Sequence, residues 1–504
     1  MADIKREIER KYEADENAGL SDLPDLTRVP GVAAVIDKGV AELDAVYYDT
    51  ADQRLAAASL TLRRRTGGGD AGWHLKLPVS DGVRDEIRAP LSDTVPRTLI
   101  GLVRSRVRDA ELVPVVRLLS ARDVRHLVDA SGGLLAEVSV DRVRAERLSG
   151  GDGTARWTEI EVELADEGDP AFLDKVEKKL RKAGVSRSAS ASKLARALSE
   201  TGRKPRKEAV VAAPPVTAGD HVLAYVRAQR DAIVELDPAV RRDVHDAVHG
   251  MRVATRRLRS TFRSYDNVLD RTVTDPIRDE LKWLAGELGI DRDQEVLTER
   301  LTAALGDLPR PLLAGPVRGR LRTWAHARRT GSRRRLVAVL DGGRYLDLLV
   351  SVDALLATPP LRRAAADTTE RTVAKAVRKD FGTLSGLVGQ AVDLPPGEGR
   401  DLAIHEARKK TKRTRYAAEL AAPVLGGPAK DLAAGMKSLQ GLLGEHQDSV
   451  MARQALCGLA AQAHAAGESG FTYGVLYGRE EHNAASVEAG LPAAWETIRS
   501  GSAF

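Results

Sequence analysis

The chain of 504 residues contains a single cysteine, Cys457. One cysteine cannot form a disulfide within the chain, and it cannot supply the paired thiolates of a Cys-rich zinc site. The sequence also lacks any run of about 18 apolar residues that could span a membrane. Its first residues lack the apolar core of a secretory signal peptide. These absences predict a soluble, cytoplasmic protein without a membrane span.

Aromatic residues are scarce as well, because Phe, Trp and Tyr together make up only 4% of the chain. Their scarcity argues against a stacking surface for single-stranded nucleic acid. Ala, Arg, Leu and Val are abundant instead, and this composition favours long helices in part of the chain. A chain of this length exceeds one ordinary hydrophobic core, so we expect two to four domains.

Charge is distributed unevenly along the chain. Residues 1–200 contain 32 Lys and Arg against 35 Asp and Glu, whereas residues 201–504 contain 46 against 37. The second part therefore has a surplus of positive charge. Such a surplus predicts a polyanionic partner, which could be nucleic acid, anionic lipid or polyphosphate.

The first patterned segment, residues 4–12, alternates like a strand. Glu7, Glu9 and Lys11 fall on one face, because successive strand side chains point to opposite sides. Two carboxylates about 7 Å apart on one face could form a metal-ligand pair beside an anion-binding ammonium group. The alternative is an edge strand whose charged face meets solvent.

Later segments repeat this alternation, and each carries charge on a single face. They lie at residues 45–50, 60–66, 73–78, 83–88, 134–141 and 157–164. The charged positions include Arg63, Arg65, His74, Lys76, Arg84, Glu86, Arg88, Glu137, Asp141, Glu159, Glu161 and Glu163. The pattern predicts a mostly antiparallel sheet of seven or eight strands. Helices are expected near residues 30–44, 93–108 and 170–198.

Periodicity alone cannot tell a solvent-facing charged side from a wet interior. Two observations favour an interior. The acids concentrate on the first and last strands, which a closing barrel would bring together. The bases are mainly Arg, whose planar fork suits phosphate oxygens. Such an interior could hold Mg²⁺ or Mn²⁺ together with an extended polyphosphate.

The Glu-x-Glu-x-Lys pattern at residues 7–11 resembles the opening of the CYTH superfamily, the triphosphate tunnel metalloenzymes. The resemblance covers roughly residues 1–200. It continues in the Tyr-Asp-Thr segment at 48–50, the Val-Asp-Arg-Val segment at 140–143, the Glu-Ile-Glu-Val-Glu strand at 159–163 and the Ser-Lys pair at 192–193. It implies an eight-stranded antiparallel tunnel barrel with flanking helices.

The same resemblance implies roles for individual residues. Catalytic roles fall to Glu7, Glu9 and Lys11, and metal-binding roles to Glu7, Glu9, Asp141, Glu159 and Glu161. Triphosphate would be bound by Lys11, Arg63, Arg65, Lys76, Arg84, Arg122 and Lys193. The implied reaction is hydrolysis of inorganic triphosphate with Mg²⁺ or Mn²⁺. Cyclisation of ATP, as in class IV adenylyl cyclases, would use the same residues and stays open.

Residues 201–216 combine basic residues and prolines without periodicity, which is typical of a linker. Residues 217–504 show helical periodicity throughout and contain an internal repeat. The stripe His249, Arg252, Arg256 and Arg259 recurs 156 residues later as His405, Arg408, Lys412 and Arg415. We therefore predict two related helical bundles, at about residues 217–345 and 346–504.

Each stripe lies on one helix face, because its members are three or four residues apart. A face of this kind predicts anion binding, and the alternative is a solvated face with compensating acids. Metal binding by the histidines is less favoured, since they lack chelating spacing. The stripes, Arg292-Asp293 and His446-x-Asp448 resemble the CHAD domain, whose family role is binding inorganic polyphosphate.

This second resemblance covers roughly residues 217–504, and the two domains in this order resemble bacterial CYTH–CHAD proteins. It implies polyphosphate binding by His249, Arg252, Arg256, Arg257, Arg259, His405, Arg408, Lys409, Lys412, Arg413 and Arg415. The sequence thus predicts an α+β protein in which a CYTH domain (1–200) precedes a CHAD domain (217–504). A non-catalytic protein of polyphosphate granules is the remaining alternative, whereas nucleic acid is the less favoured partner.

Overall fold

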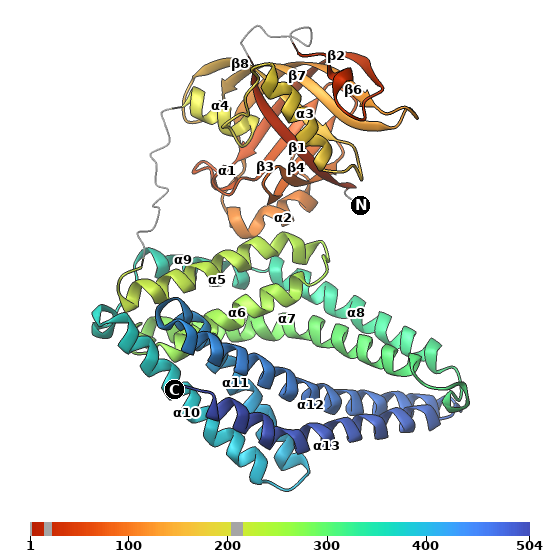
Figure 1. The fold of residues 1–504 in the computed structure, drawn as a ribbon, viewed down its shortest axis with the longest axis vertical. Helices are drawn as coiled ribbons and strands as arrows, with labels where there is room; N and C mark the ends of the chain where they lie inside the picture. The colour runs from red at the N-terminus through yellow and green to blue at the C-terminus, as the bar shows by residue number, and fades with distance from the viewer. Residues whose placement is uncertain (1–2, 15–22, 203–214) are drawn as a thin grey trace. The chain divides into compact units, whose positions relative to one another are not determined.

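The computed structural model describes residues 3–14, 23–202 and 215–504. The chain divides into two compact units, Met1–Val211 and Ala212–Phe504, and each is described by itself (Figure 1). Most of the segment expected to be a linker, residues 203–214, lies outside the described residues.

The first unit is a closed barrel of eight antiparallel strands. The strands are β1 (Asp3–Ala14), β2 (Ala34–Asp49), β3 (Thr61–Thr66), β4 (Gly72–Ser80), β5 (Val83–Ala89), β6 (Val113–Val128), β7 (Leu134–Arg147) and β8 (Thr154–Leu164). Their order around the barrel is β1-β5-β4-β3-β2-β6-β7-β8. Strand β1 closes the barrel, because its first half pairs with β5 and its second half with β8. The predicted antiparallel barrel is confirmed.

Helices cover the outside of this barrel. They are α1 (Arg54–Ala57), α2 (Arg97–Val107), α3 (Ala171–Lys182) and α4 (Lys193–Thr201), together with the 3-10 helix η2 (Leu26–Arg28). The apolar face of β3 and β4 packs under α2 through Leu62, Leu75 and Leu99. Phe172 and Leu180 of α3 belong to a second apolar cluster on the outside of β7 and β8. Because the apolar faces point outward into these cores, the charged faces point inward.

Two of the expected helices differ from the structure. The helix expected near 30–44 is wrong, because Ala34–Asp49 forms β2, which pairs with β6 over its whole length. The helix expected over 170–198 is two helices, α3 and α4. Strand β6 has no counterpart among the segments identified by alternation. Its inner and outer faces are both mixed in polarity, so residues 113–128 show little period-two contrast.

The second unit is all helical. Its helices are α5 (Ala218–Arg241), α6 (Ala247–Ser264), α7 (Arg271–Gly306), α8 (Val317–Asp341), α9 (Gly343–Ala357), α10 (Thr369–Asp393), α11 (Glu398–Leu425), α12 (Gly427–Ala465) and α13 (Phe471–Ser500). Short 3-10 turns, η3 (Arg310–Leu312) and η4 (Arg363–Ala366), lie between them. The sequence repeat maps α5–α8 onto α10–α13, and α9 lies between the two sets. The predicted helical domain is confirmed.

The two sets of helices meet along α6 and α11, the helices that carry the repeated basic stripes. Apolar residues of both helices share one core, in which Phe262 of α6 and Ala417 of α11 are buried. The Tyr265 hydroxyl donates a hydrogen bond of 3.0 Å to the Ala417 carbonyl oxygen. Among the helices of the described ranges, none is long and apolar enough to cross a membrane.

Candidate functional site

The barrel interior contains a cavity of about 180 Å³ with a strongly polar lining. Ten residues predicted from the sequence line it: Glu7, Glu9, Lys11, Arg63, Arg65, Lys76, Arg84, Arg122, Glu161 and Lys193. The two remaining predicted residues, Asp141 and Glu159, contact Lys193 from the surrounding wall. The fold therefore brings the predicted tunnel residues together.

One wall of the cavity is acidic. Asp141 of β7 pairs in register with Glu159 of β8, and Glu161 follows two residues later on the same strand face. One oxygen from each of these three carboxylates lies within 4.8 Å of the others. The Lys193 ammonium nitrogen contacts Asp141 at 2.9 Å, Glu159 at 2.7 Å and Glu161 at 2.6 Å. Three buried carboxylates thus converge on one positive charge.

The surrounding bases keep Asp141 and Glu161 ionised. Burial alone would raise the pKa of Asp141, but Arg122 and Lys193 outweigh it and the pKa is lowered. The same balance lowers the pKa of Glu161, where Lys11 is the largest favourable neighbour. Arg122 donates to Asp141 at 2.7 Å and to Glu161 at 2.5 Å. Ionised carboxylates are the state that a metal ligand requires.

The cluster of three carboxylates fits a hard divalent cation. Mg²⁺ and Mn²⁺ prefer oxygen ligands, and here three carboxylate oxygens converge on a cation-sized position now approached by Lys193. Glu7 and Glu9 lie outside this group of three. Glu7 accepts from Lys76 at 2.5 Å, whereas Glu9 lies 3.4 Å from the Lys11 ammonium. The structure therefore separates the five predicted metal ligands into a buried group of three and two lysine-paired glutamates on β1.

The opposite wall is basic. Arg63, His74 and Arg88 are register partners on β3, β4 and β5. Glu86 lies among them and contacts Arg88 at 2.5 Å, His74 at 3.0 Å and Arg63 at 3.6 Å. Burial and the nearby guanidinium of Arg63 lower the pKa of His74 to about 4, although Glu86 opposes the shift. The imidazole is therefore neutral near pH 7, and the positive charge of this wall comes from arginine and lysine.

Several lining residues were not among the predicted site residues: Lys5, Tyr47, Thr61, Asp70, Glu86, Arg88, Glu137, Glu163 and Ser192. Glu86, Arg88, Glu137 and Glu163 had been placed on the charged strand faces but were given no role in the site. Lys5 could have been found by extending the period-two pattern, because it precedes Glu7 by two residues. Asp70 lies in the turn between β3 and β4, so no periodicity indicated it.

The helical unit contains a basic groove of about 550 Å³ between α6, α7, α11 and α12. Seven of the predicted polyphosphate residues line it: His249, Arg252, Arg256, Arg257, Arg408, Lys412 and Arg415. Gly289 of α7 has a packing reason. A side chain at Gly289 would lie 3.0 Å from an Arg252 guanidinium nitrogen, so glycine makes room for that arginine.

Acidic residues pair with the arginines at the flanks of this groove. Arg252 donates to Asp293 at 2.8 and 3.3 Å. Arg257 of α6 and Arg415 of α11 both donate to Glu419, at 2.9 and 2.8 Å. One carboxylate thus ties the basic stripes of the two repeats together.

The centre of the groove is uncompensated. Among the described residues, Arg256, Arg408 and Lys412 make no ion pair or hydrogen bond. Burial, followed by repulsion from Arg408 and Arg256, lowers the pKa of Lys412 to about 6. Burial and Arg252 lower the pKa of Arg256 to about 10. The nearby acids only partly offset the repulsion among these basic groups, so a bound anion would be stabilised here.

Four predicted residues lie outside the groove lining: Arg259, His405, Lys409 and Arg413. Arg413 binds the buried Asp380 at 2.5 Å, because one residue beyond Lys412 is about 100° further around the helix. Lys409 pairs with Glu406 at 2.6 Å on the exposed side of α11. The His405 imidazole contacts the Gln447 side chain. Conversely, Arg300, Tyr416 and Gln440 line the groove and were not predicted.

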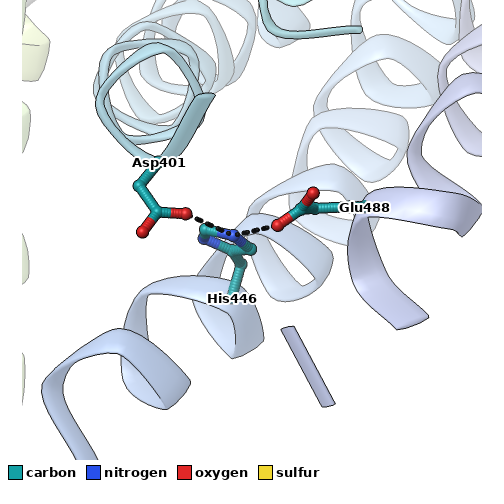
Figure 2. A group of neighbouring side chains, drawn as sticks. All are labelled: Asp401, His446 and Glu488. Atoms are coloured by element: carbon teal, nitrogen blue, oxygen red, sulfur yellow. Dashed lines mark hydrogen bonds and ion pairs between the residues drawn. The ribbon is translucent and has the colours of Figure 1, made fainter. Parts of the chain in front are cut away.

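His446 belongs to a separate cluster (Figure 2). Its Nε2 atom lies 3.2 Å from Asp401 and 3.2 Å from Glu488, so the side chain links α11, α12 and α13. Each carboxylate also faces an arginine, since Arg400 lies 3.0 Å from Glu488 and Arg453 lies 3.6 Å from Asp401. The positive charges of the two arginines balance the two carboxylates without a metal ion. We interpret the cluster as a link between helices.

Comparison with known proteins agrees with both units. A CYTH domain model matches residues 5–198, and a CHAD domain model matches residues 224–457. Uncharacterized proteins from two strains of Mycobacterium tuberculosis are 37% identical over 506 residues, covering 97% of this chain and 95% of each relative. Similar solved structures include PptA from Streptomyces chartreusis, with 22% identity and a TM-score of 0.47 over 56% of this chain and 100% of that one. The CHAD domain from Ricinus communis has 22% identity and a TM-score of 0.43 over 59% and 97%.

The chain belongs to the family of proteins in which a CYTH domain is followed by a CHAD domain. The identification made from the sequence motifs is therefore confirmed. Members of the CYTH family are triphosphate tunnel metalloenzymes. They act on triphosphate substrates with divalent metal ions, as triphosphatases or as cyclases.

Proposed function

We propose that the barrel hydrolyses inorganic triphosphate with Mg²⁺ or Mn²⁺. The observation that carries this proposal is the pairing of two walls across one small cavity. Asp141, Glu159 and Glu161 converge on one side, and Arg63 and Arg88 lie on the other. Carboxylates can hold a divalent cation while guanidinium groups bind phosphate oxygens in their forked geometry.

The basic and the acidic residues of the cavity have different roles. Lys11, Arg63, Lys76 and Arg84 bind and orient the phosphate groups, because each presents nitrogen donors to the cavity. The acidic group would hold the metal, which supplies charge neutralisation at phosphate oxygens and a lowered pKa of water. No side chain needs to form a covalent bond with the substrate, since phosphoryl transfer to water depends on positioning and electrostatics. We therefore assign catalysis to the positioning of the phosphate groups. Glu7, Glu9 and Lys11 lie beside the acidic group and take part in this positioning.

The composition of the cavity favours inorganic triphosphate over ATP. Tyr47 is its single aromatic lining residue among those the structure describes, and none of those lining residues is aliphatic. A nucleobase needs an apolar or aromatic surface, and pockets for larger organic ligands typically enclose about 300 Å³ or more. At about 180 Å³ the cavity suits a small, highly charged ligand. Cyclisation of ATP is thus the weaker candidate.

Phosphate release from tripolyphosphate in Mg²⁺ or Mn²⁺ tests this proposal. Glu159→Gln/Glu161→Gln removes two charges from the acidic group while keeping side-chain shape, so kcat should fall by about 100-fold or more. Glu146→Gln, an exposed substitution on β7, is the matched control. Parallel assays with ATP should give little cyclic AMP. Cyclic AMP as the main product would contradict the proposal, and so would full activity in the double variant.

We further propose that the groove of the helical unit binds inorganic polyphosphate. The centre formed by Arg256, Arg408 and Lys412 supports this proposal, because these three residues pair with no acid of the described residues and a polyanion would supply negative charge there. Both repeats contribute to this centre, so an extended chain can contact α6 and α11 together. Nucleic acid is less suited, since sequence readout needs contacts to bases and the groove offers one aromatic lining residue, Tyr416.

Titration of long-chain polyphosphate in about 0.1 M salt tests the groove. Arg256→Ala/Lys412→Ala should weaken binding by at least about tenfold, because each lost charge-assisted contact is worth more than 1 kcal/mol. Lys409→Ala changes a cation on the same helix outside the groove and serves as the control. Equal weakening in the control would contradict the assignment. A preference for double-stranded DNA over polyphosphate would favour the nucleic-acid alternative.

A non-catalytic polyphosphate-binding protein is the second candidate. Binding alone would need only the bases, whereas the barrel also buries Asp141, Glu159 and Glu161 at 0, 4 and 8% exposure. Their convergence within 4.8 Å supports the enzyme. If the protein binds phosphate chains tightly but releases no phosphate, the binding function replaces the enzymatic one.

A further inference from the structure

The turn between β3 and β4 places a carboxylate against the basic wall. Gly67 and Gly68 adopt left-handed conformations, with φ of 81° and 67°, and they turn the chain directly before Asp70. The Asp70 side chain forms an ion pair with Arg65 and lies 4.0 Å from Arg88. The Asp70 main-chain oxygen lies 2.9 Å from His74 Nε2. The side chain and the main-chain oxygen of Asp70 thus both contact the basic wall.

Asp70 lies at the end of that wall. Thr61, Arg63 and Arg65 project in successive rows from β3, spaced about 7 Å apart as alternate strand residues are. Arg65 pairs with Gly72 in the last register of β3 and β4. Its side chain is 7% exposed, whereas that of Asp70 is 34% exposed. The carboxylate therefore stands where the row of cavity cations meets solvent.

Arg65 needs a counterion at this position. It is buried and lies near Arg63 and Arg122, and these causes lower its pKa to about 9. Asp70 is the carboxylate that pairs with it. The last guanidinium of the wall is thus engaged by an acid of the protein itself. The other arginine near Asp70, Arg88, is shared with Glu86.

We propose that Asp70 is a specificity-determining residue that limits the length of the phosphate chain the barrel accepts. The inference rests on the proposed triphosphatase function. A chain that extends beyond the row of Arg63 must displace the Asp70 carboxylate from Arg65 and then lie beside it. Like charges at such short distance repel each other, so each further phosphate group binds less favourably. A chain that ends at the row of Arg63 meets less of this repulsion.

The test compares tetrapolyphosphate with tripolyphosphate as substrates of the full chain. Asp70→Asn keeps the shape of the side chain and removes its charge. The ratio of kcat/KM for tetrapolyphosphate to that for tripolyphosphate should rise by about fivefold in this variant. Asp70→Glu keeps the charge and should keep the ratio of the natural protein. Asp81→Asn, in the neighbouring turn between β4 and β5, is the matched control for a turn substitution.

A ratio that stays within about twofold in Asp70→Asn overturns the inference, and so does an equal rise in Asp81→Asn. If the protein binds phosphate chains without hydrolysing them, the same comparison is made by calorimetry. A background of Arg256→Ala/Lys412→Ala then removes the groove of the helical unit from the signal. A failure of the proposed function is distinguishable, because the protein then hydrolyses no phosphate chain of any length. A failure of this inference leaves hydrolysis in place with an unchanged ratio.

Discussion

Lys193 shows at the scale of one residue how the barrel manages buried charge. It is the first residue of α4, and Ser192 caps that helix by accepting from the Ala195 main-chain nitrogen at 3.0 Å. The cap fixes the start of the helix, and this start directs Lys193 into the barrel. The side chain is 9% exposed and contacts three carboxylates. An ammonium group at this position stabilises acids that would otherwise repel one another.

Replacing this lysine tests the metal assignment without an activity assay. Lys193→Met leaves the three carboxylates with less positive charge, so we expect a lower melting temperature in chelator. Added Mg²⁺ or Mn²⁺ should restore much of the loss, because a metal that binds only the folded state stabilises it. Differential scanning calorimetry with and without metal measures both effects. Lys182→Met, an exposed lysine of α3, is the control. The absence of a metal-dependent shift in both variants would contradict a metal site at the acidic group.

Lys412 gives a pH dependence to polyphosphate binding. Its pKa is lowered to about 6 by burial and by neighbouring arginines, so the free protein loses this charge above about pH 6. A bound polyanion favours the protonated form. Below pH 6 the charge is already present, whereas above pH 6 binding must take up a proton. Affinity should therefore be highest near pH 5.5 and should weaken by up to about tenfold per pH unit above 6.

Calorimetry in buffers of different ionisation enthalpy measures this proton uptake at pH 7. We expect uptake in the natural protein and a clear reduction in Lys412→Met. Lys409→Met, on the exposed side of the same helix, should behave like the natural protein. Uptake that persists unchanged in Lys412→Met would contradict the assignment of the proton to this side chain.

At the scale of elements, the turn between β3 and β4 has little freedom to change. A Cβ atom on Gly67 would lie 2.0 Å from the Glu42 carbonyl oxygen, and the residue has a φ of 81°. Alanine is disfavoured by both the contact and the conformation. Gly67→Ala should therefore lower the free energy of unfolding by about 1–3 kcal/mol.

Chemical denaturation measures this loss, and Gly69→Ala in the same turn is the control. Gly69 has no positive φ, and a Cβ atom there would meet no atom within 4 Å. The Gly69 variant should differ from the natural protein by less than about 0.5 kcal/mol. Equal losses in the two variants would show that the turn tolerates neither side chain for reasons other than this contact.

A strand could be predicted from the sequence when its two faces differed clearly in polarity. β8 alternates Glu159, Glu161 and Glu163 with apolar residues, and its position was correct. β2 was expected to be a helix over part of its length, near residues 30–44. Much of its first half is exposed, so no buried face imposed a strand period on its sequence. Pairing with β6 decides its conformation, and this pairing joins residues about 80 positions apart.

At the scale of the whole molecule, an enzymatic barrel and a polyanion-binding groove are present in one chain. A groove that retains long chains would raise the concentration of chain ends available to the barrel. Arg256→Ala/Lys412→Ala should therefore raise KM for long-chain polyphosphate relative to KM for tripolyphosphate. Steady-state kinetics on both substrates measure the ratio, with Lys409→Ala as control. An unchanged ratio would show that the two units act separately.

The sequence by itself determined the family, the barrel and helical classes of the two units, and the candidate residues of each site. These features depend on local patterns, such as alternation on strands and the repeated basic stripe on α6 and α11. Tertiary structure decided which way the charged faces point. Helices packed outside the barrel take the apolar faces, and the charged faces are left to line the interior.

Tertiary structure also decided which cations are free. Arg413 and Lys412 are neighbours in sequence, yet Arg413 binds the buried Asp380, whereas Lys412 lies in the groove and pairs with no acid of the described residues. Asp70 joined the barrel site only because a glycine turn folds back toward Arg65. Neither outcome has a local signature, because an ion pair depends on partners that distant parts of the chain bring together.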